Sequence, residues 1–275
     1  MTRHKKTAEL IERAVEILAA HAPMTVRQVY YQLVSRQVIE NSRSAYQSVS
    51  KALVAARREG LIPWRSIEDR LRRPRVVSMW SGLAEFSRVV ASSYRRNLWE
   101  LQPIRVEVWL EKDALSGIFE DILDPYGVTL NVGRAFDGWD SIHNAAQRLG
   151  DEDVILYFGD FDPSGEDMVR SLRERLADQG SRPEVQKCAL VFEDIERYQL
   201  PPDFTKASDT RSAAFVAKWG DVSVELDALP LDALRERIIR DVESRLDLNA
   251  LATLRAIEMQ DRSRLRGALD LLGGS

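Results

Sequence analysis

The spacing of hydrophobic residues predicts three helices in the first part of the chain. Between residues 7 and 59, apolar side chains recur three or four positions apart, which is typical of a helix with one buried face. The predicted helices span residues 7–20, 26–36 and 44–59. Thr25 suits the N-cap of the second helix, and Gly60 suits the end of the third. Residues 61–70 are expected to form a short extended segment, and residues 80–100 a single long linking helix.

The pattern changes after Pro103 to short apolar runs that alternate with amphipathic segments. Nearly continuous apolar runs separated by helices predict a parallel sheet with helices on both faces. The expected strands are residues 104–110, 128–132, 153–158 and 187–192, and the expected helices are residues 113–123, 141–149 and 163–177. From Leu231 onward the chain is predicted to be helical, either as cover for the sheet or as an interface, and the pattern leaves both open.

Composition narrows the class of protein. The 275 residues are 44% hydrophobic and 30% charged, with a mean hydropathy of -0.30, which fits a globular protein of two domains and excludes collagen-like or wholly disordered chains. No apolar stretch of about 18 residues occurs, so we expect a cytoplasmic protein without a membrane partner. One cysteine and three scattered histidines argue against a disulfide and a zinc site, so any catalytic metal is expected on oxygen ligands.

Charge is distributed unevenly. Residues 1–76 hold 15 Lys and Arg against 7 Asp and Glu, a net +8, whereas the rest of the chain carries -12. Three helices with a positive charge are typical of a winged helix-turn-helix, with residues 44–59 as recognition helix, although a solvated basic face is an equal alternative. The residues expected to contact nucleic acid are Arg57, Arg58, Arg65, Arg72, Arg73 and Lys112.

These patterns together define the expected fold class and domains. The fold class is α/β: an N-terminal all-α winged helix-turn-helix followed by a parallel-sheet domain with a C-terminal helical extension. The expected domains are residues 1–76 (DNA binding), 77–103 (linker helix), 104–230 (catalytic) and 231–275 (helical extension).

Acidic residues follow two of the predicted strands. Glu111 ends the first, and Asp160 and Asp162 follow the third; ligands collect at this edge of a parallel sheet. Because the surrounding motif offers too few cations, the three carboxylates are predicted to hold Mg²⁺, with Mn²⁺ as a possible substitute. The structural alternatives are that Asp162 caps the helix starting at Pro163 and that Glu111 forms a surface ion pair with Lys112.

Two segments, VEVWLEKDAL and YFGDFDPSGEDM, resemble the two halves of a Toprim domain. Their EKDA and DFDPSG forms are most similar to the topoisomerase VI A subunit and the related meiotic double-strand-break transesterases, which also carry an N-terminal winged helix. The resemblance covers roughly residues 24–170. It implies a Mg²⁺-dependent enzyme that cleaves double-stranded DNA, with Asp160 and Asp162 as metal ligands and Glu111 as a metal ligand that also moves protons.

The segment TVRQVYYQLV is similar to the motif around the nucleophilic tyrosine of that family, and the match places the nucleophile at Tyr31. Helical geometry separately predicts a buried Tyr30 and an exposed Tyr31 near Arg27. Arg27 is expected to lower the pKa of Tyr31 and to hold the phosphate. Hydrolysis by metal-activated water with an idle Tyr31, and a non-catalytic DNA-binding subunit, remain alternatives.

Partners and one further acidic pair complete the expectations. The resemblance implies a homodimer, and the chain lacks GxxxxGK[ST], so strand passage would need a separate ATPase partner. Glu225 and Asp227 have the same spacing as Asp160 and Asp162. An edge strand with outward acids is favoured for them over a second metal or DNA contact.

Overall fold

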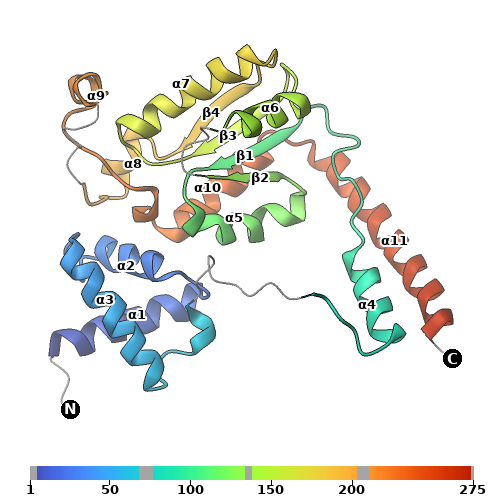
Figure 1. Ribbon diagram of the computed structural model, residues 1–275, viewed down its shortest axis with the longest axis horizontal. Helices are drawn as coiled ribbons and strands as arrows, with labels where there is room; N and C mark the ends of the chain where they lie inside the picture. Colours follow the sequence, from blue (N-terminus) through green and yellow to red (C-terminus); the bar gives the residue numbers. More distant parts are fainter. Residues whose placement is uncertain (1–4, 68–76, 134–137, 203–210, 274–275) are drawn as a thin grey trace.

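The first part of the chain forms the three predicted helices. The computed structural model describes residues 5–67, 77–133, 138–202 and 211–273 (Figure 1). The helices are α1 (Lys5–His21), α2 (Val26–Ser35) and α3 (Arg43–Arg58). Thr25 caps α2 through a reciprocal pair of hydrogen bonds with Gln28, which satisfies N–H groups that the first turn leaves without helical partners. Gly60 follows α3 with φ +76°, a left-handed conformation that glycine adopts without strain.

The segment after α3 is more compact than the extended stretch we expected. Trp64–Ser66 form a 3₁₀ turn, η1, before Ile67 makes a single parallel bridge with Met24. Arg57 lies over the Trp64 ring at 4.2 Å and donates to the Trp64 carbonyl oxygen, which favours a turn over an extended path. Arg72 and Arg73 lie outside the described residues.

The prediction of one long helix over residues 80–100 is wrong. Helix α4 spans only Leu83–Ser93. Beyond it, the carbonyl oxygen of Tyr94 accepts hydrogen bonds from Arg262, and the Tyr94 hydroxyl donates to Asp261 at 3.0 Å. These contacts with the C-terminal helix hold Tyr94 in an extended conformation and end α4. Local helical spacing was therefore overridden by tertiary hydrogen bonds.

The second part is a four-stranded parallel sheet with helices on both faces, as predicted. The strand order is β2-β1-β3-β4, with β1 (Val106–Leu110), β2 (Thr129–Val132), β3 (Val154–Phe158) and β4 (Glu184–Ala189). Every pairing is parallel. The connecting elements are η2 (Asp113–Leu115), α5 (Ser116–Leu123), η3 (Asp124–Tyr126), α6 (Trp139–Arg148), α7 (Pro163–Asp178), α8 (Phe192–Arg197), α9 (Ser212–Trp219) and η4 (Leu226–Ala228).

Alternate residues of the two central strands enter two different cores. Val108 and Leu156 pack with α5 and with α10 (Leu231–Glu243) on one face. Trp109 and Ile155 pack with α6 and α7 on the opposite face. Because successive side chains point to opposite faces, this alternation determines toward which face the residues after each strand point.

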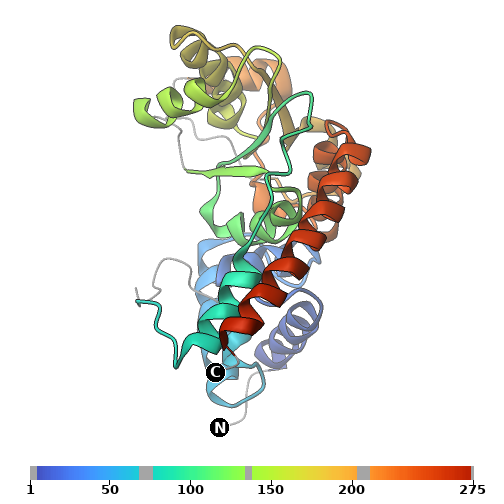
Figure 2. The ribbon, with the colours of Figure 1, turned by 90° about the vertical axis from the view of Figure 1, so that its right-hand side faces the viewer.

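The C-terminal helices have two different positions. Helix α10 covers the sheet, and its Leu234, Ile238 and Val242 are fully buried. Helix α11 (Leu248–Gly273) instead lies along α4, and the two extend away from the sheet as an arm (Figure 2). Of the helices in the described ranges, none has both the length and the hydropathy needed to cross a membrane.

The N-terminal helices share a core with the sheet. One continuous cluster of buried apolar residues runs from Leu10 in α1 through β1 and β3 to Val242 in α10. Helix α2 lies against η4, and the Gln32 amide donates to the Leu229 carbonyl oxygen at 3.4 Å. This packing brings α2 to the end of the sheet where the acidic residues lie.

Candidate functional site

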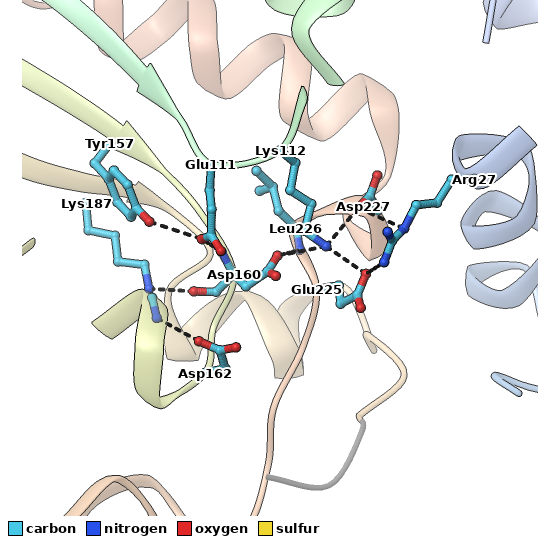
Figure 3. A network of polar contacts seen from close by, with 11 residues as sticks. Arg27, Glu111, Lys112, Tyr157, Asp160, Asp162, Lys187, Glu225, Leu226 and Asp227 are labelled. Atoms are coloured by element: carbon cyan, nitrogen blue, oxygen red, sulfur yellow. Dashed lines mark hydrogen bonds and ion pairs between the residues drawn. The ribbon is translucent and has the colours of Figure 1, made fainter. Parts of the chain in front are cut away.

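The site is built where β1 and β3 end side by side. The Glu111 N–H donates to the Phe158 carbonyl oxygen at 2.9 Å, so the ladder continues one residue past the end of β1. Glu111 Oε2 then accepts from the Asp160 N–H at 3.0 Å and from the Tyr157 hydroxyl at 3.1 Å (Figure 3). The structure therefore brings together Glu111 and Asp160, which are about fifty positions apart in the sequence.

Two glycines make this close arrangement possible. A Cβ on Gly159 would come within 2.5 Å of Glu111 Oε2, and a Cβ on Gly165 would clash with the Asp160 carbonyl oxygen. Asp162 Oδ1 accepts from the Gly165 N–H at 2.7 Å and caps α7. The helix-cap interpretation of Asp162 thus describes its observed contacts, and only its second oxygen remains available for another ligand among the described residues.

Lys112 neutralises the acidic site from within. Its ammonium lies 3.1 Å from Asp160 Oδ1, 2.7 Å from Glu225 Oε2 and 3.0 Å from Asp227 Oδ2. The side chain is only 11% exposed, and the three carboxylates together outweigh the effect of burial and raise its pKa. The prediction that the motif offers too few cations is therefore wrong, because Lys112 lies among these acids. Its expected contact with nucleic acid stays a prediction.

Glu225 and Asp227 belong to this site and not to an edge strand. Asp227 lies in the 3₁₀ turn η4, and its side chain is fully buried. The Leu226 N–H donates to Asp160 Oδ1 at 2.8 Å, which fixes this turn against the end of β3. The spacing of the two acids was visible in the sequence, but their partners lie more than sixty positions away, so no local pattern could place them.

Lys187 in β4 is a second cation that the sequence analysis missed. Its ammonium donates to the Asp160 carbonyl oxygen at 2.9 Å and to Glu166 Oε1 at 2.6 Å. It holds the backbone between β3 and α7 from the side opposite to Lys112. The carboxylate of Asp160 therefore has little freedom to move.

Arg27 and Tyr31 reach the site from α2. Arg27 Nη2 donates to Glu225 Oε2 at 2.8 Å. Tyr31 is only 7% exposed, so the prediction that it is exposed is wrong: α2 packs on η4 as well as on α1 and α3, which buries both of its faces. Burial and a hydrogen bond with Glu225 raise the pKa of Tyr31 well above its usual value, and Arg27 only partly offsets this. The expected lowering of that pKa is therefore also wrong.

The carboxylates differ in how readily they ionise. Burial raises the pKa of Asp160 to about 7; Lys112 opposes the rise and Glu111 adds to it. Burial also acts to raise the pKa of Glu225, but Lys112, Tyr31 and Arg27 outweigh it and lower the pKa to about 2. The site thus combines one carboxylate that is permanently charged at neutral pH with another that resists ionisation.

The donor set suits a hard cation, but the side chains are not assembled around one. Glu111, Asp160 and Asp162 each use one oxygen in hydrogen bonds within the protein, and the other oxygen has no hydrogen-bond partner among the described residues. Within those residues no three Asp, Glu, His or Cys side chains form a ready metal-binding group. Because Mg²⁺ takes only one or two protein carboxylates and fills its shell with water and phosphate, Glu111 and Asp160 are compatible with it.

Of the other predicted nucleic-acid contacts, the three in the described residues lie in α3 and η1. Arg58 and Arg65 are exposed at the end of α3 and in η1. Arg57 is half-buried against Trp64.

No protein-family model matches this chain, and no curated protein sequence matches it significantly.

Proposed function

We propose that this protein is a Mg²⁺-dependent enzyme of Toprim type that hydrolyses phosphodiester bonds in nucleic acid, with double-stranded DNA as a substrate. The observation that carries the proposal is the hydrogen bond from the Asp160 N–H to the Glu111 carboxylate, at the carboxyl ends of two adjacent parallel strands. Parallel sheets bind ligands at this edge, and hard oxygen donors there suit a divalent cation beside a phosphate. The basic first 76 residues supply the charge expected of a nucleic-acid-binding region.

The residues around the proposed ion have separate tasks. Glu111 and Asp160, with the second oxygen of Asp162 nearby in sequence, would hold Mg²⁺ or Mn²⁺. When bound, the ion would supply positive charge for the reacting phosphate and acidify a water molecule. Lys112 fixes Asp160 through Oδ1 and leaves Oδ2 for the ion. Lys187 fixes the backbone of the same residue.

Water is favoured over Tyr31 as the nucleophile. A phenol attacks phosphorus as its phenolate, and both the burial of Tyr31 and its raised pKa oppose that form. Transesterification by Tyr31 is the second candidate because Arg27 lies 5.8 Å from its ring, where it would stabilise a phenolate. That reaction would require Tyr31 to lose its proton despite its burial and its hydrogen bond with Glu225, and we propose a homodimer and a separate ATPase partner only in that case.

A non-catalytic nucleic-acid-binding subunit is the candidate from another class. The neutralisation of Asp160, Glu225 and Asp227 by Lys112 and Arg27 favours it, because these ion pairs would stabilise the acids without any metal. A non-catalytic subunit of this kind would bind DNA with an affinity that falls as salt is added and that EDTA does not change.

Cleavage of end-labelled DNA distinguishes the three candidates. Duplex and single-stranded DNA are incubated with Mg²⁺, with Mn²⁺ or with EDTA, and the products are separated under denaturing conditions with and without protease treatment. We expect free cleaved ends with either metal, none in EDTA, and a loss of at least a hundredfold in Asp160→Asn and Glu111→Gln. Glu152→Gln, an exposed acid at the opposite end of β3, is the matched control and should retain activity.

The outcomes exclude one another. Label that remains on the protein until protease treatment, and that disappears in Tyr31→Phe, would establish transesterification instead of hydrolysis. DNA binding without cleavage under either metal would establish the non-catalytic subunit. Equal cleavage by wild type and Asp160→Asn would refute the acidic site.

A further inference from the structure

A pocket of about 370 Å³ lies between α2 and the start of α3. It is lined by Arg27, Tyr30, Tyr31, Asn41, Ser42, Arg43 and Tyr46. Its volume falls within the range of pockets that bind small organic groups. None of these seven lining residues is acidic, and two are arginines.

The wall of this α2–α3 pocket is aromatic and rigid. Tyr30 contacts Tyr31 and Tyr46 edge to face, with ring centroids 5.0 and 5.3 Å apart. The Tyr30 hydroxyl donates to Asn41 Oδ1 at 2.8 Å and accepts from the Ser42 N–H at 2.9 Å, which locks the central ring. Tyr46 is 37% exposed, so part of its ring is available to a flat ligand. Nucleobases stack on such exposed rings whatever their sequence.

Beside this aromatic wall, the lining of the pocket is basic. Arg43 is exposed in the first turn of α3, next to the N-cap Ser42. A guanidinium at the start of a sixteen-residue helix is placed to bind an anion, because the helix N-terminus adds partial positive charge. An aromatic wall beside a basic rim matches a base joined to a phosphate.

The pocket is also connected to the acidic site. Arg27 lines the pocket and pairs with Glu225, which shares Lys112 with Asp160. A nucleotide in the pocket would therefore lie beside Arg27, which Glu225 and Lys112 link to Asp160 (Figure 3). A base within a stacked pair has both faces covered, so only an unpaired or flipped-out base could reach the wall.

We infer that the α2–α3 pocket binds one unpaired nucleotide, with its base against Tyr46 and its phosphate on Arg43. The inference rests on the proposed function and deepens it, since it names the substrate class: nucleic acid with an unpaired nucleotide next to the bond that is cleaved. Single-stranded DNA and RNA share this chemistry, and both are arms of the test.

Binding without metal tests the pocket separately from cleavage. Fluorescein-labelled single-stranded DNA, single-stranded RNA and blunt duplex DNA are titrated in EDTA and followed by fluorescence anisotropy. We expect Tyr46→Ala to weaken single-strand binding by roughly ten- to a hundredfold and Tyr46→Phe to restore it, because stacking needs the ring and not the hydroxyl. Arg43→Gln should weaken binding and reduce its salt dependence.

Trp139→Ala is the control, because Trp139 is an exposed aromatic residue at the start of α6, on the face of the sheet opposite to α5 and α10. It should leave binding unchanged. Thermal unfolding of each variant shows whether a loss of binding comes from a loss of fold.

The results separate the pocket from the proposed function. Single-strand binding that is equal in wild type and Tyr46→Ala would overturn the pocket, even if metal-dependent cleavage is found. Single-strand binding that requires Tyr46, in a protein that cleaves nothing with Mg²⁺ or Mn²⁺, would support the pocket and refute the enzyme. Equal loss of single-strand and duplex binding in Tyr46→Ala would also overturn the inference, because it would assign Tyr46 to general DNA contact.

Discussion

At the residue scale, Lys112 has the most unusual surroundings in the site. Three carboxylates from two distant segments converge on its ammonium within about 3 Å. Neither oxygen of Asp227 has a hydrogen bond among the described residues, so its ion pair with Lys112 is its main compensation for burial. Breaking a buried ion pair costs more than forming it gains, because the remaining charges stay desolvated.

Lys112→Met should therefore destabilise the protein strongly. Removal of the cation leaves Asp160, Glu225 and Asp227 facing one another, and we expect the free energy of unfolding to fall by about 3 kcal/mol. Urea denaturation at neutral pH measures this change. Lys51→Met, at an exposed position of α3, should change it by less than about 0.5 kcal/mol. Similar values for the two variants would show that the ammonium does not stabilise the cluster.

Glu225 predicts a dependence of stability on acid. Its pKa is lowered from 4.5 to about 2 on folding, so its contribution is present above the unfolded value and is lost as pH falls toward 2. The difference in unfolding free energy between wild type and Glu225→Gln should be largest near about pH 6 and shrink as pH decreases. Asp160 has a raised pKa, which acts on stability with the opposite sign, and the charge of Glu225 contributes to that rise.

The origin of this effect is tested in a Lys112→Met background. Lys112 is the strongest of the charges that lower the pKa of Glu225. In that background, the difference in unfolding free energy caused by Glu225→Gln should therefore decrease less as the pH falls. Urea denaturation at several pH values measures both series. A difference between wild type and Glu225→Gln that stays constant down to pH 2 would contradict the role assigned to Glu225.

At the element scale, the turn from β3 into α7 determines where the acids lie. Pro163 starts the helix, Asp162 caps it, and Gly165 lets the first turn approach the Asp160 carbonyl oxygen. Each of these residues has a local reason to be there that is independent of metal binding. The turn is therefore a rigid support for Asp160.

Two glycine substitutions should have opposite effects. Gly165→Ala places a methyl group against the Asp160 backbone, which cannot easily move, and should lower the unfolding free energy by about 1–3 kcal/mol. Gly267→Ala lies in α11 with open space around it and should raise the stability of that helix by up to about 1 kcal/mol. Thermal denaturation measures both variants. Stabilisation by Gly165→Ala would show that the turn has room to spare.

The elements were predictable where local pattern and packing agree. Apolar runs identified β1 and β3, and cap residues identified the starts of α2 and α7. The helix expected through Tyr94 failed because Arg262 and Asp261, far along the chain, compete for its hydrogen bonds. Strand-end position identified Glu111 and Asp160, since parallel strands deliver their ends to one edge.

The rest of the site depends on contacts between distant segments. Lys112 was read as a nucleic-acid contact because nothing near it in the sequence reveals Glu225, 113 positions away. Tyr31 was expected at the surface because helical spacing shows one buried face of α2 and gives no sign of η4 on the other. Motifs therefore gave the location of the site, and tertiary packing decided the state of each side chain.

At the scale of the whole molecule, the three N-terminal helices and the sheet form one packed body. The buried cluster from Leu10 to Val242 is continuous, and the ion pair between Arg27 and Glu225 adds a polar connection at the same place. The arm of α4 and α11 differs, since Leu251 and Leu254 of α11 belong with Leu98, which follows α4, to a small separate cluster. Size and continuity of a core determine which segments unfold together.

The boundary between units that unfold separately, as measured by native-state hydrogen exchange, should therefore differ from the boundary between the basic and acidic parts of the chain. We expect amides of α2 and β3 to exchange through the same global unfolding as urea is increased, because opening one would expose the core of the other. Amides of α4 and the C-terminal half of α11 should exchange through a smaller opening at lower free energy. Mass spectrometry of peptic peptides compares the expected global opening, in residues 26–35 and 154–158, with the smaller opening, in residues 83–93. If residues 26–35 open independently of residues 154–158, the basic N-terminal part is a separate folding unit, and the shared core does not couple it to the acidic site.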